Sequence, residues 1–475
     1  MRKIILLLLV CVVTSCTTEL NDSIDFDEVV NPNLSEQSVV GQPNSSDIWR
    51  QGLERQMSNV LNETLVLSEL GSDNYVNTQT FYSQFLDNLE IRTDDPDLED
   101  VMFDISRLRE MVNFGLEQVG PADENYTSEI EAEYHFFKGM SYLYAGMYFS
   151  QLPQEEGGST FSSDENYNSA ISSLNTAIGL NPKPEYYMAA ARANYYLGNQ
   201  TEAVQAANEA LAIDGEFLRS AQFDEQNGPA NTLESALYER GTFDDLQPLP
   251  TLDFLDPKYS FLTASEDPSV HYLKAEEAHL ILAEANLANS DLSSAQTNLE
   301  DLLAVVSNRE VRTIDDAAED RPEPEATLND PRPNDPVVVV NGRSGLVFNR
   351  QAGDVDIPSV SGTSLTQTDI DKMSDNDDAL SLLYRTRQEI FIAEGLRFVD
   401  MGVKLVIHQN EFLQNPNISD GDPGTTPVIP SFIDSVKGDL DGFTYDEDAK
   451  SATTTIDLNS ILVANKSSDA VLPFH

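Results

Sequence analysis

The residue types that most often carry enzyme chemistry occur in this chain, but not at the spacings that the chemistry needs. No two of the histidines have the i, i+4 spacing of a zinc-binding helix. Residues 341–345 do not form a nucleophile elbow, and no glycine-rich loop of a phosphate site is present. We therefore expect that the protein is not an enzyme and needs no cofactor. The histidines are His135, His271, His279, His408 and His475.

Carboxylates are so frequent that finding a pair of them says nothing about catalysis. Arg387 and Glu394, and Glu389 and Arg397, are about two helical turns apart and would share one face of a helix. Because buried charges are tolerated only when paired, we interpret this segment as a structural clamp, in which Gly395 allows another backbone to approach. The same structural role is predicted for three further glutamates, Glu276, Glu277 and Glu284.

An acidic loop near the C-terminus raises the question of calcium. Asp439 to Gly442 followed by Asp446 to Asp448 supplies oxygen ligands, but Lys450 stands where a calcium loop of the EF-hand type would place its bidentate glutamate. A solvated acidic loop is the favoured interpretation, and a structural calcium ion is the alternative.

Candidate ligand contacts lie in two segments that combine aromatic side chains with carboxylates and amides, the groups that bind sugar rings and hydroxyls. One segment follows the first predicted helix, and the other lies in a central stretch of low periodicity (residues 222–263). Burial in the core is the alternative for each single aromatic residue. The predicted ligand-binding residues are Asp73, Asn74, Tyr75, Phe81 and Tyr82 from the first segment, and Phe243, Asp245, Phe254 and Tyr259 from the second.

The N-terminus has the pattern of a lipoprotein signal peptide. Arg2 and Lys3 precede ten apolar residues, a length too short for a membrane-spanning helix. Small residues then lead to Cys16, as in the lipobox of bacterial lipoproteins. We expect cleavage after residue 15, acylation of Cys16 and a polar tether over residues 16–46. Cleavage would also remove Cys11, the other cysteine, so no thiol chemistry is expected.

The charge of the chain limits its partners. There are 81 acidic and 28 basic residues, which gives a net charge of −53. Such a surface repels nucleic acid and anionic headgroups, and it argues more weakly against a polyanionic substrate. Since the charge is spread along the chain, it indicates a solvated surface more than a site.

Helical periodicity dominates the rest of the chain. The predicted helices cover residues 47–70 with Asp47 as N-cap, a segment after Pro96, residues 130–149, residues 186–197 and residues 377–406. The aromatic residues of the third segment are predicted to pack in the core. Brief β-rich runs are expected at 337–340, 453–456 and 461–463.

An internal repeat links the central helices. Ala170, Ala177 and Leu180 recur 33 residues later as Ala203, Ala210 and Ile213, close to the period of tetratricopeptide (TPR) units. Ala285 and Ala295 indicate a third unit, and residues 128–152 supply half of a fourth. We predict long surface loops at residues 315–336 and 341–376, part of which could be disordered.

Four stretches of the chain resemble the SusD/RagB family of Bacteroidetes outer-membrane lipoproteins. Any one of them would be a weak signal, but they follow the order of the family. Lys258 stands where the family usually has arginine. The stretches are 132–144, which lead to Leu152-Pro153, then 255–259, 272–286 and 385–401.

This resemblance implies a mostly α-helical, TPR-like SusD-like fold with loop-rich excursions and minor β structure. It places one domain at residues 47–475, with helical units over about 128–306 and ligand- or partner-facing parts over about 315–376 and 410–475. It also implies a TonB-dependent outer-membrane transporter (SusC-like) as partner, a glycan ligand delivered to it, and a lipid-anchored location on the outer membrane facing the exterior. The single tryptophan, Trp49, is expected to pack in the first helix.

Two other functions remain open at this point. The same architecture could bind peptides, or it could be a TPR scaffold without a small ligand.

Overall fold

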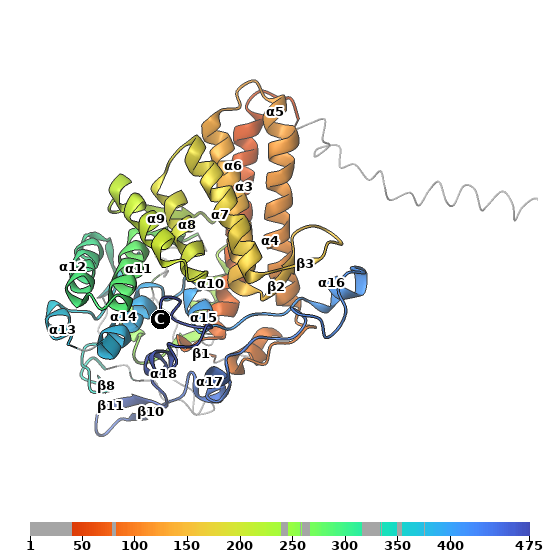
Figure 1. Ribbon diagram of the computed structural model, residues 1–475. Coiled ribbons are helices and arrows are strands. Elements are labelled where there is room, and N and C mark those ends of the chain that lie inside the picture. Colours follow the sequence, from red (N-terminus) through yellow and green to blue (C-terminus); the bar gives the residue numbers. More distant parts are fainter. Residues whose placement is uncertain are drawn as a thin grey trace, which may run out of the picture.

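The computed structural model describes residues 40–77, 82–238, 246–256, 258, 267–315, 333, 335–348, 354–374 and 376–475. These residues are mostly helical, with short strands in small sheets (Figure 1), so the predicted fold class is confirmed. The helices are α3 (Ser45–Leu70), α4 (Pro96–Phe114), α5 (Gly120–Ala122), α6 (Ser128–Tyr148), α7 (Ser163–Leu180), α8 (Pro184–Tyr196), α9 (Gln200–Ile213), α10 (Thr232–Tyr238), α11 (Ala275–Ala288), α12 (Leu292–Asn308), α13 (Gln367–Asp371), α14 (Asn376–Ile390), α15 (Leu396–Asp400), α16 (Gln409–Gln414), α17 (Ser431–Asp434) and α18 (Leu458–Ala464). The strands are β1 (Tyr75–Asn77), β2 (Gln151–Pro153), β3 (Thr160–Ser162), β4 (Leu218–Ala221), β5 (Leu246–Pro248), β6 (Val270–Lys274), β7 (Val311–Asp315), β8 (Val339–Val340), β9 (Asp354–Pro358), β10 (Phe443–Asp446) and β11 (Ser451–Thr454).

Three helical hairpins follow one another and confirm the predicted repeat. Helix α6 packs on α7, α8 on α9, and α11 on α12. In Figure 1, α3, α4, α6 and α7 form the long upright bundle, and the later hairpins extend from its side. The helices pack closely because small residues line their contacts, among them the fully buried Ala193, Ala203 and Ala295.

The predicted aromatic stripe of α6 lies in the core. Tyr134, Phe136, Phe137 and Tyr148 are almost completely buried, and the ring of Phe136 stacks on Tyr186 of α8. Trp49 packs in α3 as expected, where its indole N–H donates to the carbonyl of Met111 at 2.8 Å. The core therefore begins in the first helix and continues through the repeats.

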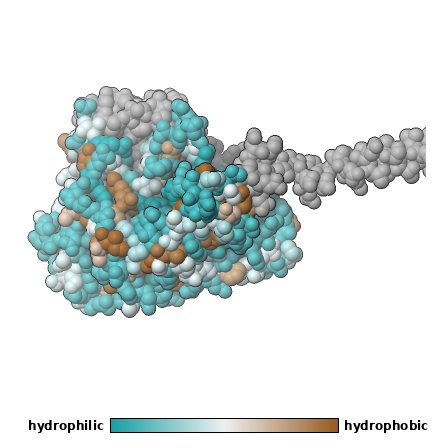
Figure 2. Space-filling view, turned by 90° about the horizontal axis from the view of Figure 1, so that it is seen from above, coloured by the Kyte–Doolittle hydropathy of each residue, from teal (hydrophilic) through white to brown (hydrophobic). Residues whose placement is uncertain are grey.

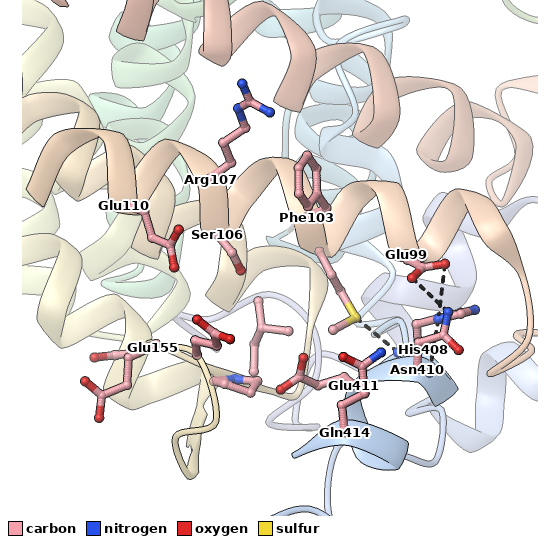
Figure 3. A pocket seen from close by; sticks show the side chains of 15 residues that line it. Glu99, Phe103, Ser106, Arg107, Glu110, Glu155, His408, Asn410, Glu411 and Gln414 are labelled. Atoms are coloured by element: carbon pink, nitrogen blue, oxygen red, sulfur yellow. Dashed lines mark hydrogen bonds and ion pairs between the residues drawn. The ribbon is translucent and has the colours of Figure 1, made fainter. Parts of the chain in front are cut away.

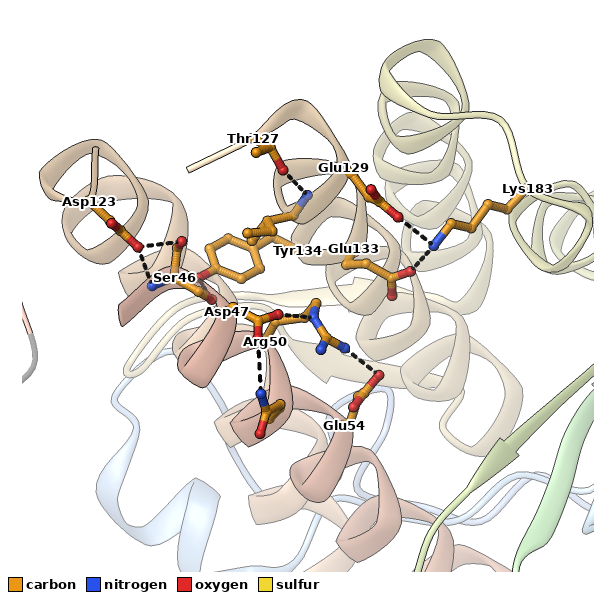
Figure 4. Close-up of polar contacts among 12 residues, drawn as sticks. Ser46, Asp47, Arg50, Glu54, Asp123, Thr127, Glu129, Glu133, Tyr134 and Lys183 are labelled. Carbon is orange, nitrogen blue, oxygen red and sulfur yellow. Dashed lines mark hydrogen bonds and ion pairs between the residues drawn. The ribbon is translucent and has the colours of Figure 1, made fainter. Parts of the chain in front are cut away.

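Helix α3 begins two residues earlier than predicted, and Asp47 is not its N-cap. Asn44 occupies that position without a side-chain cap. Asp123 supplies the missing cap. Its carboxylate accepts from the backbone N–H of Ser46 at 3.0 Å and from the hydroxyl of Ser46 at 2.7 Å (Figure 4). These hydrogen bonds, together with those from Asn44 and Asn125, lower the pKa of Asp123 to about 2.

The prediction of one continuous helix over residues 377–406 was wrong, because this segment is interrupted. It is divided into α14 and α15 by a turn in which Ala393 and Gly395 have positive φ angles of 60° and 77°. The ammonium groups of Lys258 and Lys274 both donate to the carbonyl of Ile390, at 3.2 and 2.9 Å, and so occupy an acceptor that a continuing helix would use itself.

Most of the small sheets join segments that are distant in the chain, whereas β2 and β3 form a local hairpin. Strand β8 pairs with β11, which pairs with β10, so part of the predicted run at 337–340 is a strand. The run predicted at 453–456 overlaps the end of β11. The β structure predicted at 461–463 was wrong, because these residues belong to helix α18. The first turn of α18 is capped by Asp457, and its Leu462 is fully buried.

The surface seen from above is mostly hydrophilic, with small separate hydrophobic patches (Figure 2). Within the described ranges, every helix is too short or too polar to span a bilayer. The predicted signal peptide, Cys16 and most of the predicted tether lie outside these ranges.

Close packing between α6 and α7 can be tested at one glycine. A Cβ at Gly139 would lie 2.6 Å from Cγ of Leu174, so Gly139→Ala should lower the free energy of unfolding by about 1–3 kcal/mol. In α7, a Cβ at Gly179 would meet nothing within 4 Å, so Gly179→Ala should leave stability unchanged or raise it by up to about 1 kcal/mol. Denaturant unfolding measures both, and equal midpoints would contradict this packing.

Candidate functional site

The two segments predicted to carry ligand contacts do meet in the fold. Strand β1 pairs antiparallel with β5, with Tyr75 opposite Pro248 and Asn77 opposite Leu246. The backbone N–H of Leu249 also donates to the carbonyl of Asn74 at 3.0 Å. The segment after the first helix therefore lies against the central stretch.

The described residues of the first segment make internal contacts. Arg397 holds Asp73 by two hydrogen bonds of 2.5 and 2.8 Å, and the amide of Asn74 donates to Glu69 at 2.7 Å. Asp73, Asn74 and Tyr75 are all buried. Their side chains fix the turn after α3, and their part in ligand binding stays a prediction.

The second segment is described only in part. Phe254 is half-buried against the small cluster of Val338, Val340 and Val347, and its backbone N–H donates to the carbonyl of Leu346. Tyr82 begins a 3-10 helix, Tyr82–Asn88. The remaining predicted contacts lie outside the described residues; they are Phe81, Phe243, Asp245 and Tyr259.

A buried ion cluster lies under the turn between α14 and α15. Glu394 forms an ion pair with Lys258 and another, at 2.6 Å, with Lys274, and all three side chains are at most 3% exposed. Burial lowers the pKa of Lys274 to about 8, against the opposing effect of Glu394. The cluster joins three of the four stretches that resemble the SusD/RagB family.

The clamp predicted on this segment exists, but its predicted partners were wrong. Arg387 pairs with Asp400 at 2.6 Å instead of Glu394, and Arg397 pairs with Asp73 instead of Glu389. The reason is the turn at 391–395, which changes the face on which the later residues lie. A Cβ at Gly395 would lie 2.5 Å from the hydroxyl of Tyr148, so a side chain and not a backbone approaches this glycine most closely.

The three glutamates of α11 have structural partners, as predicted. Glu277 accepts from Arg192 at 2.8 and 2.6 Å, and Glu284 accepts from the hydroxyl of Tyr195 at 2.7 Å. Burial raises the pKa of Glu284 to about 7. Burial also acts to raise the pKa of Glu276, but its pairing with Arg309 lowers that pKa to about 2.

No group of three or more His, Cys, Asp or Glu side chains within the described ranges is arranged to hold a metal ion. In the acidic loop raised as a calcium candidate, the ammonium of Lys450 lies 3.5 Å from the carboxylate of Asp335. The loop therefore carries an ion pair at the position that a calcium loop would give to a bidentate acid.

An open groove lies between α4, the β2–β3 hairpin and α16 (Figure 3). We call it the α4–α16 groove, and its volume is about 580 Å³. This is in the usual range for small-molecule pockets. Its lining residues are Glu99, Met102, Phe103, Ser106, Arg107, Glu110, Leu152, Pro153, Gln154, Glu155, Glu156, His408, Asn410, Glu411 and Gln414.

This groove was not predictable from the sequence, because its walls come from segments that are far apart in the chain. Asn410, for example, donates to Glu99 at 2.8 Å across 311 residues. One signal was present. Phe103 lies off the apolar stripe of α4 and is 56% exposed, although an aromatic residue on a polar helix face is unusual.

A second cavity of about 460 Å³ lies between α3 and β4. Its main basic group, Arg219, is neutralised by Glu133 at 3.1 Å, Glu54 at 3.4 Å and Glu185 at 3.5 Å. Among the described residues, Glu110, Glu155 and Glu156 of the α4–α16 groove form no ion pair, which makes this groove the better candidate for a charged or hydroxylated ligand.

Together, these features define a helical-repeat protein with buried structural ion pairs and an open polar groove. No protein-family model and no curated protein sequence matches the chain. Solved structures do match it over most of its length.

The fold is that of the SusD-like proteins. A SusD superfamily protein from Bacteroides fragilis matches with a TM-score of 0.53 and 15% identity, over 80% of this chain and 100% of the other. A SusD-like carbohydrate binding protein from Bacteroides fragilis NCTC 9343 matches with a TM-score of 0.51 and 11% identity, over 83% and 96%. A SusD-like carbohydrate binding protein from Bacteroides vulgatus ATCC 8482 matches with a TM-score of 0.50 and 13% identity, over 76% of this chain and 83% of the other. The resemblance stated from four sequence stretches is thus confirmed in the fold.

The ion cluster can be tested by removing the charge of Glu394. Glu394→Gln would take away the carboxylate that pairs with two buried ammonium groups, so we expect the free energy of unfolding to fall by about 3–5 kcal/mol. Glu202→Gln on the exposed face of α9 is the matched control, with an expected change within about 0.5 kcal/mol. Denaturant unfolding at neutral pH measures both variants. Similar midpoints would show that the cluster does not hold the turn.

Proposed function

We propose that this protein is a lipid-anchored outer-membrane protein that binds an oligosaccharide at the cell surface and delivers it to a TonB-dependent transporter. It acts by binding and carries out no chemical reaction. The observation that carries the proposal is the SusD-like fold, shared with structures described as carbohydrate binding proteins.

The composition of the candidate surfaces supports a sugar ligand. Exposed Phe103 offers an aromatic face at the edge of the α4–α16 groove, beside Arg107, and carboxylates and amides from α4 and α16 line the groove itself. Half-buried Phe254, packed against Val338 and Val347, offers a second aromatic side chain. Aromatic faces pack against the apolar side of a sugar ring, while carboxylates and amides bind its hydroxyls.

Binding should be measured with the mature protein by isothermal titration against neutral, amino and acidic oligosaccharides, beside a peptide panel. We expect saturable binding of at least one oligosaccharide without any turnover of it. Affinity purification of the lipidated protein from outer membranes should recover a TonB-dependent transporter. Binding of peptides alone, hydrolysis of a bound glycan, or recovery of a solitary protein would contradict the proposal.

The anchor gives a separate prediction. Cys16→Ser removes the thiol that acylation needs, so the protein should move from the membrane fraction to the soluble fraction. Fractionation with detection of the protein measures this, and Cys11→Ser is the matched control because cleavage would remove that residue. Membrane retention of the Cys16→Ser variant would show that Cys16 is not the anchor.

A further inference from the structure

A small second core lies apart from the main core of the protein. Strands β8, β10 and β11 form a sheet at the lower left edge of the molecule, below α14 and α18 (Figure 1). We call residues 335–348 and 443–454, which contain these strands, the flap. The flap has its own cluster of buried apolar side chains, and proteins open locally in contiguous units of this kind. The members of the cluster are Val338, Val340, Leu346, Val347 and Ala452.

The sheet of the flap is covered on one face only. Val338 and Val340 are fully buried, whereas Val337 and Val339 between them are 62% and 39% exposed. Ala452 of β11 lies opposite Val340 and is buried with it. Because side chains alternate between the two faces of a strand, the inner face of the sheet holds the cluster and the outer face meets the solvent.

The β10–β11 hairpin of the flap leaves the body through a narrow neck. Gly442 precedes β10 and Thr455 follows β11, and the backbone N–H of Thr455 donates to the carbonyl of Gly442 at 2.6 Å. A Cβ at Gly442 would lie 2.6 Å from Oγ1 of Thr455, so the two chain segments touch there. Just outside the neck, Leu440 and Ile456 belong to the main core. One pair of residues therefore separates the two cores and is placed as a hinge.

The flap is latched to the body at the 3-10 helix Asp253–Leu255. The carboxylate of Asp253 accepts from the backbone N–H of Phe348 at 2.8 Å, and the N–H of Phe254 donates to the carbonyl of Leu346 at 3.0 Å. The side chain of Phe254 packs against both apolar clusters, and among the described apolar side chains it is alone in doing so. This half-buried ring therefore joins the flap to the main core.

A polar contact adds to the latch. The guanidinium of Arg343 in the flap donates to the hydroxyl of Ser364 at 3.0 Å and lies 3.6 Å from the carboxylate of Glu389 on α14. Glu389 also accepts hydrogen bonds from the hydroxyl of Thr363 and from the backbone N–H of Ser364, both at 2.7 Å. When Arg343 moves away, the buried carboxylate keeps these donors, so release of the latch does not leave it unsatisfied.

We propose that the flap opens about the Gly442–Thr455 neck while the helical body stays folded, and that this opening gives access to Phe254. The contacts of Phe254 and Arg343 hold the closed position. In the open position the ring of Phe254 is released from the cluster of the flap and can pack against a ligand, such as the apolar side of a sugar ring. The ligand step rests on the proposed function, whereas the opening itself does not.

The cysteine content of the chain allows a direct test, because Cys11 and Cys16 are its only cysteines. The mature protein with Cys16→Ser has no thiol, so one introduced cysteine can be followed by its reaction with an aromatic disulfide reagent. Ala452→Cys places this thiol in the cluster of the flap, and Ala203→Cys places it in the main core as a matched control; the two alanines are 1% and 0% exposed. We expect the flap thiol to react at least about tenfold faster, since it needs only a local opening.

Changes at the latch give a second readout. Phe254→Ala and Arg343→Gln should each raise the labelling rate of Ala452→Cys, the first by at least about tenfold, and leave the rate of Ala203→Cys as it was. Phe412→Ala is the matched control, because Phe412 is also half-buried but packs against the main core alone. It should not change the labelling of the flap. Circular dichroism of each variant checks that its helices are intact.

The labelling of the free protein decides whether the flap opens by itself. Equal rates for the two thiols would overturn the proposal, because both would then react through unfolding of the whole protein. The same conclusion would follow if Phe254→Ala raised both rates by the same factor.

A bound ligand tests the access to Phe254. A glycan that binds in the titrations of the proposed function should hold the flap open and speed the labelling of Ala452→Cys, and Phe254→Ala should abolish this effect. If a glycan binds and the labelling is unchanged or slower, the access role of the flap is overturned and the proposed function stands. If no glycan binds, the proposed function and the access role fail together, while the labelling of the free protein still decides on the opening.

Discussion

The ion cluster of Glu394, Lys258 and Lys274 is the interaction on which the rest of the fold depends. The carboxylate of Glu394 faces two ammonium groups out of water, and both lysines donate to the last carbonyl of α14, that of Ile390. A charge buried in this way is tolerated only with its partners in place. The cluster therefore ends one helix, fixes the turn that starts the next, and joins the central stretch, α11 and the C-terminal third of the chain.

From that turn, a second set of polar contacts reaches the first helix. The backbone N–H of Gly395 donates to Glu69 at 3.0 Å, and Arg397 holds Asp73 beyond the end of α3. The segment that carries predicted ligand contacts is thus positioned by residues more than 300 places later. A disturbance of the cluster would reach the β1–β5 pair through these bonds.

The repeat units were predictable because their signal is local. Small residues at a fixed period and breakers such as Asn181-Pro182 specify α7, α8 and α9 without knowledge of the rest of the chain. The break at 391–395 was not predictable, because the lysines that cause it lie 116 to 134 residues away. The cap of α3 was missed for the same reason, since Asp123 comes from 77 residues downstream. The α4–α16 groove could not be foreseen either, because three distant segments form it and only exposed Phe103 marks it locally. The predicted contacts Asp73, Asn74 and Tyr75 lie beside strand β5 of the central stretch, but the buried network around them has no local signature.

The cap supplied by Asp123 has a mechanical consequence. The predicted tether ends where α3 begins, so a pull on the proposed membrane anchor would act first on the opening turn of this helix. In that turn, Ser46 donates two hydrogen bonds to Asp123 in the loop before α6. The hydroxyl of Tyr134 on α6 donates to the carbonyl of Ser46 at 2.7 Å. Tension would therefore be shared between α3 and α6 from the first turn of α3, instead of unwinding α3 from its end.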